Sequence, residues 1–252
     1  MIDVTPVVPE ARDIVRKAAT AYITHCEPWF VGLLIHGSAL KGGYIPNCSD
    51  IDFQLFLRPG AFVGKGELPW DVARRIHEDL ARIDPAPFRY IQCIEWEEGW
   101  SGDGMITIPG TYHMVAGRCP KREASEEEVR ASARTCLDTF DARPHFVAHG
   151  LLQHGAGRLA RNVRLLCTDV WPALYNLLVV RQPDAIAIWQ LTKPEAINLL
   201  EPESEIAVRM RAFDAAVRAH YPDEATVEGA LAVLDTGIQA LQSVKATWES
   251  MQ

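Results

Sequence analysis

The hydrophobic pattern of this 252-residue chain changes character once, near residue 120, and that change limits the folds it can adopt. Before it, short apolar or alternating runs predict strands, and amphipathic stretches between them predict helices. The predicted strands are 30–36, 50–57 and 88–96, with shorter strand-like pieces at 105–109 and 111–117, and the predicted helices are 9–25 and 70–83. Strands mixed with helices in this way indicate a sheet domain of the α/β or α+β class.

Beyond residue 121 almost only helical periodicity remains. Ser125 followed by Glu128 forms a capping box, which marks the start of a helical run. The predicted helices are 126–140, 151–181, 184–199, 203–220 and 224–250. Bends or helix boundaries are expected at the prolines Pro172, Pro183, Pro194 and Pro202. We therefore predict two domains, a sheet domain over 1–120 and a helical bundle over 121–252.

Composition narrows the classes of partner. Acidic residues outnumber basic ones and the formal net charge is −8, whereas a surface that holds nucleic acid normally has a basic excess. No uncharged apolar run approaches the roughly 18 residues of a membrane span, and the first residues do not resemble a signal peptide. The six cysteines are scattered without a C-x-x-C pair, which favours reduced thiols. We expect a cytoplasmic protein without a nucleic-acid or membrane partner.

A glycine turn and two aspartates stand close together in GSALKGGYIPNCSDIDFQ, residues 37–54. Asp50 and Asp52 should point to one face of a strand, while Ile51 and Phe53 are buried on the other. Two like charges side by side are unfavourable unless a cation lies between them. Mg²⁺ prefers one or two carboxylates plus substrate phosphate oxygens, and the backbone of a glycine turn can approach a phosphate closely. The alternative is an ordinary turn followed by a solvated carboxylate pair.

The stretch LLIHGSALKGGYIPNCSDIDFQLFL resembles the signature of the nucleotidyltransferase superfamily: an apolar strand, Gly-Ser, a short connection, then Asp-apolar-Asp-apolar. A second stretch, residues 161–191, resembles the C-terminal helical domain of the aminoglycoside adenylyltransferases that modify streptomycin and spectinomycin. Together the two stretches touch both predicted domains. Residues 85–150 match these families poorly.

This resemblance implies an α+β fold, with a polymerase-beta-like mixed-sheet catalytic domain followed by a helical substrate-binding bundle. It also implies transfer of AMP, or another nucleoside monophosphate, from ATP or another nucleoside triphosphate to a hydroxyl group, with release of pyrophosphate. We would expect the site in the cleft between the two domains. By position in the motif, Asp50 and Asp52 would bind Mg²⁺ and act in catalysis, while Gly37 and Ser38 would contact the β- and γ-phosphates.

Two further cations are candidates for nucleotide binding. Lys41 closely follows the Gly-Ser turn. Arg158, Arg161 and Arg164 recur at three-residue spacing, so they lie roughly along one helix face. They form either a solvated stripe or a cluster facing the triphosphate, and the resemblance around residue 162 favours Arg161 for the second role.

The superfamily usually carries a third carboxylate on a later strand of the same sheet, where it binds metal and often serves as general base. The corresponding strand here is FRYIQCIEW, which offers Arg89, Tyr90 and Gln92 at its early and middle positions. Glu95, near the end of the strand, is the candidate catalytic residue. If Glu95 does not fill this role, either the helical domain supplies a base or the site is impaired.

The acceptor is less constrained. An acidic loop with Trp96 and Trp100 could hold a cationic acceptor through charge and cation–π contact. We expect a small hydroxylated molecule, such as an aminoglycoside-like antibiotic, and a monomer or homodimer. The alternatives are a protein hydroxyl, an RNA end, or a degenerate nucleotide-binding module without transfer activity.

Overall fold

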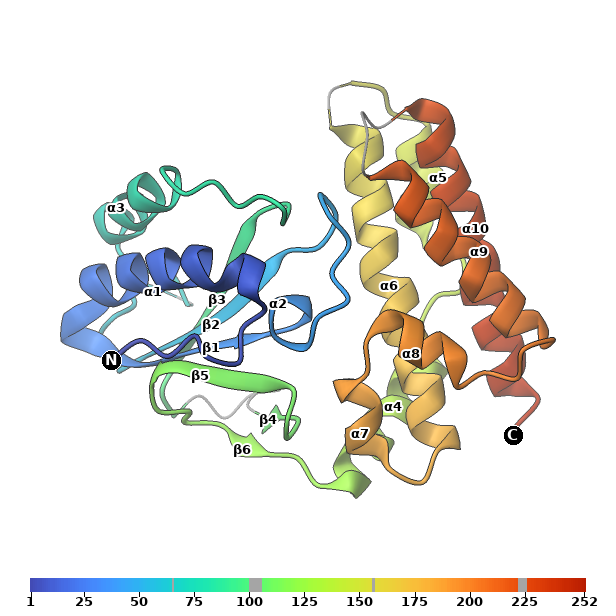
Figure 1. The fold of residues 1–252 in the computed structure, drawn as a ribbon, viewed down its shortest axis with the longest axis horizontal. Coiled ribbons are helices and arrows are strands. Elements are labelled where there is room, and N and C mark those ends of the chain that lie inside the picture. The colour runs from blue at the N-terminus through green and yellow to red at the C-terminus, as the bar shows by residue number, and fades with distance from the viewer. Residues whose placement is uncertain (65, 100–105, 156, 222–225) are drawn as a thin grey trace. The chain divides into compact units, whose positions relative to one another are not determined.

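The computed structural model describes residues 1–64, 66–99, 106–155, 157–221 and 226–252. It divides into two compact units, Met1–Ala124 and Ser125–Gln252 (Figure 1). The first unit combines helices with a sheet, and the second unit is helical where the structure describes it, so the chain is α+β. The boundary between the units falls after Ala124, four residues later than the predicted boundary at 120.

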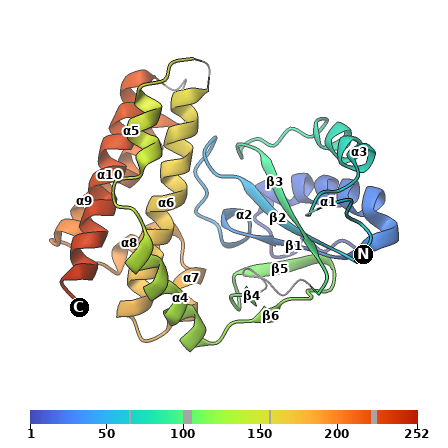
Figure 2. The same ribbon diagram turned by 180° about the vertical axis from the view of Figure 1, so that it is seen from behind.

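The first unit is built on a four-stranded mixed sheet with the strand order β3-β2-β1-β5 (Figure 2). Its strands are β1 (Phe30–His36), β2 (Ile51–Leu57), β3 (Ile91–Glu97) and β5 (Tyr112–Gly117). β1 is antiparallel to β2 and β5, whereas β2 and β3 are parallel. A parallel pair requires a crossover connection, and here that connection contains helix α3 (Trp70–Leu80). Two short strands form a separate parallel pair. They are β4 (Ile106–Thr107), which comes after β3 in the sequence, and β6 (Arg122–Glu123), which comes after β5.

The alternation along β2 divides its side chains between the two faces of the sheet. Phe53 and Leu55 are buried in a core with Val15 and Tyr22 of α1 (Arg12–Cys26) and with Val72 of α3. Figures 1 and 2 both show α1 and α3 on this face of the sheet. On the other face, Val31, Leu34 and Phe56 form a smaller cluster. Asp52 and Gln54, in phase with Phe56, therefore lie on the face opposite α1 and α3.

Three short helices complete the described part of the first unit. A 3₁₀ turn over Pro9–Ala11 leads into α1, a second over Glu27–Trp29 connects α1 to β1, and α2 (Ser38–Lys41) is a single turn between β1 and β2. The predicted helix over 9–25 corresponds to the first of these turns together with α1.

The second unit packs its long helices around a common apolar core. Its helices are α4 (Glu126–Thr139), α5 (His145–Leu151), α6 (Arg158–Arg181), α7 (Ala185–Gln190), α8 (Lys193–Asn198), α9 (Glu205–His220) and α10 (Val227–Glu249). Trp171 of α6 and Phe213 of α9 are in ring contact, with centroids 5.3 Å apart. A Cβ on Gly237 of α10 would lie 2.6 Å from the Leu166 side chain, so a glycine is needed where α10 approaches α6.

Two predicted helices are wrong in extent. The single helix expected over 151–181 is divided into α5 and α6, because Gly155 and Gly157 between them adopt positive φ angles of 137° and 76°. The helix expected over 184–199 is divided into α7 and α8 at Thr192, which caps α8 in a reciprocal capping box with Glu195. Pro172, expected at a bend or boundary, lies inside α6.

Helix α6 is the one helix in the described residues that is long and apolar enough to cross a membrane by length and composition. Of the window concerned, 61% is buried inside the protein. Such burial is characteristic of a core helix.

Two residues one turn apart on α4 hold the connection between α6 and α7. The Arg130 guanidinium donates to the carbonyl oxygens of Val179 and Gln182, both at 2.7 Å, and also to that of Pro183. The Glu126 carboxylate accepts from the backbone N–H groups of Ala185 (2.7 Å) and Ile186 (3.1 Å). These bonds satisfy carbonyls at the end of α6 and amides at the start of α7, which a helix leaves without internal partners.

We predict that Arg130→Ala lowers the free energy of unfolding of the helical unit by about 2 kcal/mol, the size expected for loss of hydrogen bonds to a charged donor. Urea unfolding followed by far-ultraviolet circular dichroism measures this change. Arg134→Ala is the matched control, since Arg134 is exposed on the same helix, and it should cost less than about 0.5 kcal/mol. Equal effects of the two substitutions would contradict the role of Arg130.

Candidate functional site

The turn after β1 requires glycine for two separate reasons. Gly37 has φ 75°, and its carbonyl accepts the N–H groups of Leu40 (3.2 Å) and Lys41 (3.1 Å) as α2 begins. A Cβ on Gly37 would lie 2.6 Å from Oδ2 of Asp52. The backbone conformation therefore favours glycine, and any side chain here would displace the Asp52 carboxylate.

The two aspartates lie on one face, as predicted. Asp52 stands between His36 of β1 and Gln92 of β3 in the register of the sheet. Asp50 precedes β2 by one residue, and the backbone N–H of Ile51 between the two aspartates donates to the Tyr90 carbonyl at 3.1 Å. The prediction that Ile51 and Phe53 are buried is confirmed, with exposed fractions of 0% and 1%.

Tyr90 links Asp50 to Gln92. The Tyr90 hydroxyl lies 2.7 Å from Oδ2 of Asp50 and 3.0 Å from Oε1 of Gln92. A phenol has a single hydroxyl proton, which goes to the closer and charged acceptor, Asp50. The Gln92 amide carries donors as well as an acceptor, so it can turn its NH₂ group toward the Tyr90 oxygen. A polar chain then runs from Gln92 through Tyr90 to Asp50.

Glu95 is not part of this group. It is the register partner of Leu55, and it stands three residues beyond Gln92, so its side chain points to the opposite face of the sheet. There it lines a cavity of about 600 Å³ together with Tyr22 and Cys93. The carboxylate expected beside Asp52 is thus absent from β3, and Gln92 occupies that place.

The thiols near Glu95 are kept protonated by their surroundings. Burial, and secondly the Glu95 carboxylate, raise the pKa of Cys26 to about 11. The same two causes raise the pKa of Cys93. None of the six cysteines, all of which lie in the described ranges, forms a disulfide, as expected from their spacing.

A buried lysine on the aspartate face was not identified from the sequence. Lys121 is 8% exposed, and its Nζ donates to Oε1 of Gln54 at 2.8 Å. The same nitrogen lies 4.0 Å from the ring centroid of Trp96. Burial lowers the pKa of Lys121 to about 8, which still leaves it mainly charged at pH 7. The boundary predicted at 120 assigned Lys121 to the helical domain, but it belongs to the first unit.

Trp96 therefore already contacts a cation from its own unit. From the sequence, this ring is a candidate contact for a cationic acceptor, and in the structure the Lys121 ammonium lies over it. Glu98, in the same predicted acidic loop, forms an ion pair with Arg118. Trp100 lies outside the described residues.

His36, beside Asp52 in the register, is kept neutral at pH 7. Burial lowers its pKa to about 4, with a further contribution from the nearby Lys121 charge, while Asp50 acts in the opposite direction. Asp50 and Lys121 are thus both close enough to His36 to affect its charge.

The remaining predicted residues divide between the two units. Ser38 is 8% exposed at the start of α2, and Lys41 is half-buried at its end, so both are near the Gly37 turn. Arg161 is an exposed residue near the start of α6 in the second unit. Arg161 is therefore not among the residues that the first unit alone brings together around Asp50 and Asp52.

The donor set of the first unit suits a magnesium ion better than a transition metal. The described residues contain no cluster of three or more His, Cys, Asp or Glu side chains that could hold a metal by themselves. Asp50 and Asp52 supply two carboxylates on one face, and Mg²⁺ typically takes one or two carboxylates and completes its shell with water and phosphate oxygens. The residues present fit that arrangement.

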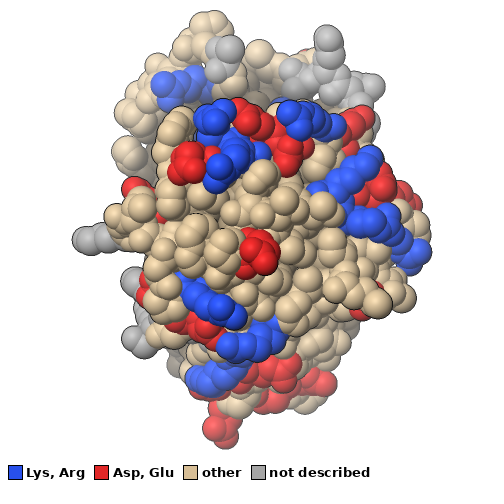
Figure 3. Space-filling view, turned by 90° about the vertical axis from the view of Figure 1, so that its left-hand side faces the viewer, with Lys and Arg blue, Asp and Glu red and all other residues tan. Residues whose placement is uncertain are grey.

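The face of the molecule shown in Figure 3 carries basic and acidic side chains side by side. Acidic and basic side chains of the first unit also form ion pairs within helices, including Lys17–Asp13 (2.7 Å) on α1 and Arg75–Asp71 (3.1 Å) on α3. Among the described residues visible on this face, the basic side chains do not form a continuous area.

Comparison with models of protein families finds no match for this chain, and comparison with curated proteins finds none either.

Proposed function

We propose that this chain is a Mg²⁺-dependent nucleotidyltransferase that moves AMP, or another nucleoside monophosphate, from a nucleoside triphosphate to a hydroxyl group of a small molecule. The observation that carries the proposal is the contact between the Gly37 turn and the Asp52 carboxylate. A turn without a side chain beside a carboxylate pair offers a phosphate both backbone N–H groups and a nearby metal site. The first unit would then be the polymerase-beta-like catalytic domain that the signature implies.

Each residue of the group has a defined task in this reaction. Asp50 and Asp52 would hold Mg²⁺, and Tyr90 keeps the Asp50 carboxylate in place through its hydroxyl. Gly37 and Ser38 would contact the β- and γ-phosphates. Lys121 adds a fixed positive charge to the same face as the aspartates, and Lys41 adds one near the turn. When bound, the metal would neutralise charge on the phosphoryl oxygens.

The transfer replaces a phosphoanhydride bond of the nucleoside triphosphate with a phosphoester bond to the acceptor. The acceptor oxygen forms a bond to the α-phosphorus and loses its proton, while the bond from that phosphorus to pyrophosphate breaks. Because the reaction involves charge redistribution more than covalent chemistry by the protein, positioning and electrostatics account for most of the catalysis.

A second function, nucleotide binding without transfer, is favoured by Gln92. The superfamily's third carboxylate would stand beside Asp52, and the structure has an amide there. An amide can donate and accept hydrogen bonds but cannot take the proton of the acceptor hydroxyl at neutral pH.

We predict that the protein releases pyrophosphate from ATP with Mg²⁺ when a hydroxylated acceptor is present, and that Asp50→Asn and Asp52→Asn each slow release by about two to three orders of magnitude. A panel of aminoglycosides and other hydroxylated antibiotics supplies the acceptors. Asp71→Asn, an exposed aspartate of the same unit, is the control and should retain full activity.

Release that persists at the normal rate in the Asp50→Asn/Asp52→Asn double variant would refute the transferase assignment. Metal-dependent ATP binding without release for any acceptor would instead support the second function.

We predict that Gly37→Ala weakens Mg²⁺–ATP binding by about tenfold or more, because the new methyl group meets the Asp52 carboxylate. Gly60→Ala is the matched control: Gly60 has φ 93°, and a Cβ there would have no neighbour within 4 Å. Both substitutions place a side chain at a positive φ angle, which should cost about 1–3 kcal/mol of stability. Isothermal titration of both variants with Mg²⁺–ATP separates the effect of backbone strain from that of the methyl group beside Asp52. If the two variants bind Mg²⁺–ATP with similar affinity, the result counts against a phosphate site at this turn.

We predict that Gln92→Glu raises the affinity for Mg²⁺ in the presence of ATP by about tenfold, because it adds a carboxylate beside Asp52. Gln92→Leu removes the amide without adding charge, so it shows what loss of the Tyr90 hydrogen bond does alone. If the second function holds, Gln92→Glu should also produce pyrophosphate release that the natural chain lacks. An unchanged Mg²⁺ affinity would place Gln92 away from the metal.

A further inference from the structure

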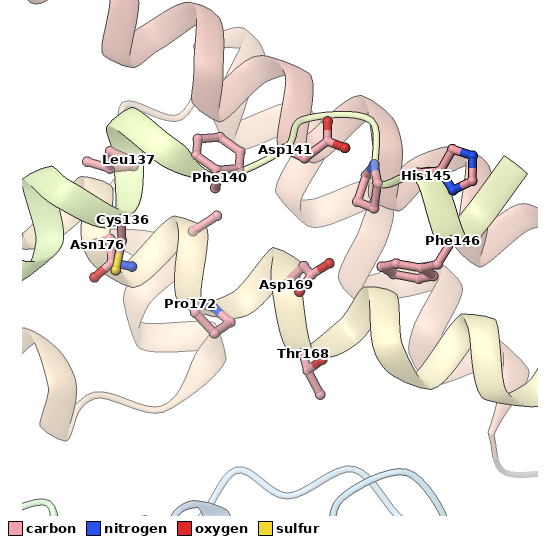
Figure 4. A pocket seen from close by; sticks show the side chains of 12 residues that line it. Cys136, Leu137, Phe140, Asp141, His145, Phe146, Thr168, Asp169, Pro172 and Asn176 are labelled. Carbon is pink, nitrogen blue, oxygen red and sulfur yellow. The ribbon is translucent and has the colours of Figure 1, made fainter. Parts of the chain in front are cut away.

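The helical unit contains a cavity of about 470 Å³ between the end of α4, the start of α5 and the middle of α6. This volume lies within the range of small-molecule sites in proteins. The cavity has mainly apolar walls, contributed by Leu137, Phe140, Pro144, Phe146, Pro172 and Ala173. In the view of Figure 4, the side chains of Asp141 and Asp169 lie between the rings of Phe140 and Phe146.

Asp141 and Asp169 are exposed to solvent where they line the cavity, and they give it a negative charge that no Lys or Arg of the described helical unit pairs with. In the described part of the helical unit, the ion pairs involve other residues, and neither carboxylate is paired with Lys or Arg. Asp141 accepts only the backbone N–H of Arg143, at 2.8 Å. Both carboxylates line the same cavity, and partial burial, together with the charge of Asp141, raises the pKa of Asp169. A cation in the cavity would stabilise the charged form of both carboxylates.

Helix α6 adds a neutral acceptor at the same place. Pro172 lies inside α6 and has no N–H group, so the Thr168 carbonyl one turn earlier lacks the partner that a regular helix provides. Thr168 and Pro172 both line the cavity. A carbonyl without its usual donor favours a ligand that carries N–H groups of its own.

We infer that this cavity binds a primary organic ammonium ion that carries an aromatic or aliphatic group. The ammonium N–H groups would donate to the Asp141 and Asp169 carboxylates and to the Thr168 carbonyl, and the apolar group would lie against Phe140, Phe146 and Pro172. Anions are repelled by the aspartates, and a quaternary ammonium has no N–H to donate. The inference does not depend on nucleotidyl transfer, because the cavity is formed by the helical unit alone.

The test uses the full chain and 2-phenylethylammonium as the probe, with isothermal titration as the readout. We expect saturable binding of the probe, at least about tenfold weaker binding of its N,N,N-trimethyl derivative, and no detectable binding of 2-phenylethanol. Absence of probe binding at millimolar concentration, or equal binding of all three compounds, would overturn the inference.

Two substitutions localise the binding. Asp169→Asn should weaken it about tenfold or more, whereas Glu249→Gln, at an exposed carboxylate near the end of α10, should leave it unchanged. Pro172→Ala restores the missing helix hydrogen bond, so it should raise the melting temperature and yet weaken the binding several-fold. A higher melting temperature together with weaker binding shows that the variant has lost the carbonyl acceptor and has not unfolded. Affinity unaffected by Asp169→Asn and Pro172→Ala would place the ligand elsewhere.

Discussion

The close approach of the Asp52 carboxylate to Gly37 is the constraint on which the arrangement of the first unit's site depends. It exists because β1 and β2 are antiparallel neighbours, with His36 opposite Asp52, so Gly37, the residue after β1, lies next to the carboxylate. Only glycine satisfies both the positive φ angle and the short distance. The backbone of the turn is therefore held beside Asp52, within the same local structure that presents Asp50.

Other side chains on the same face of the sheet supply a hydrogen-bond donor and a positive charge. Tyr90 donates to Asp50, and the buried Lys121 lies over Trp96 while it donates to Gln54, two residues beyond Asp52. His36 stays neutral because burial lowers its pKa. The face thus has two carboxylates and a buried ammonium in fixed positions, and electrostatic stabilisation is most effective when such charges are fixed before the ligand arrives.

The elements with a strong local pattern were predicted well. The strand over 30–36 matches β1, and the capping box at Ser125 and Glu128 starts α4 as expected. Helix divisions were predicted less well, because α5 and α6 are separated by glycines within a run that otherwise keeps helical periodicity. Pro172 failed as a boundary signal, since packing of α6 in the core outweighs the loss of a single backbone hydrogen bond.

The sequence by itself determined that a strand-containing part precedes a helical part and that Asp50 and Asp52 share a face, because helical periodicity and alternation along one strand are local properties. Only the tertiary structure decided which residue of β3 stands beside Asp52: the parallel register pairs Asp52 with Gln92 and sends Glu95 to the other face. The same holds for Lys121, which reaches Gln54 across 67 residues of sequence, and for Arg130, which caps α6. Such contacts depend on the pairing of distant segments, which periodicity and spacing along the chain do not encode.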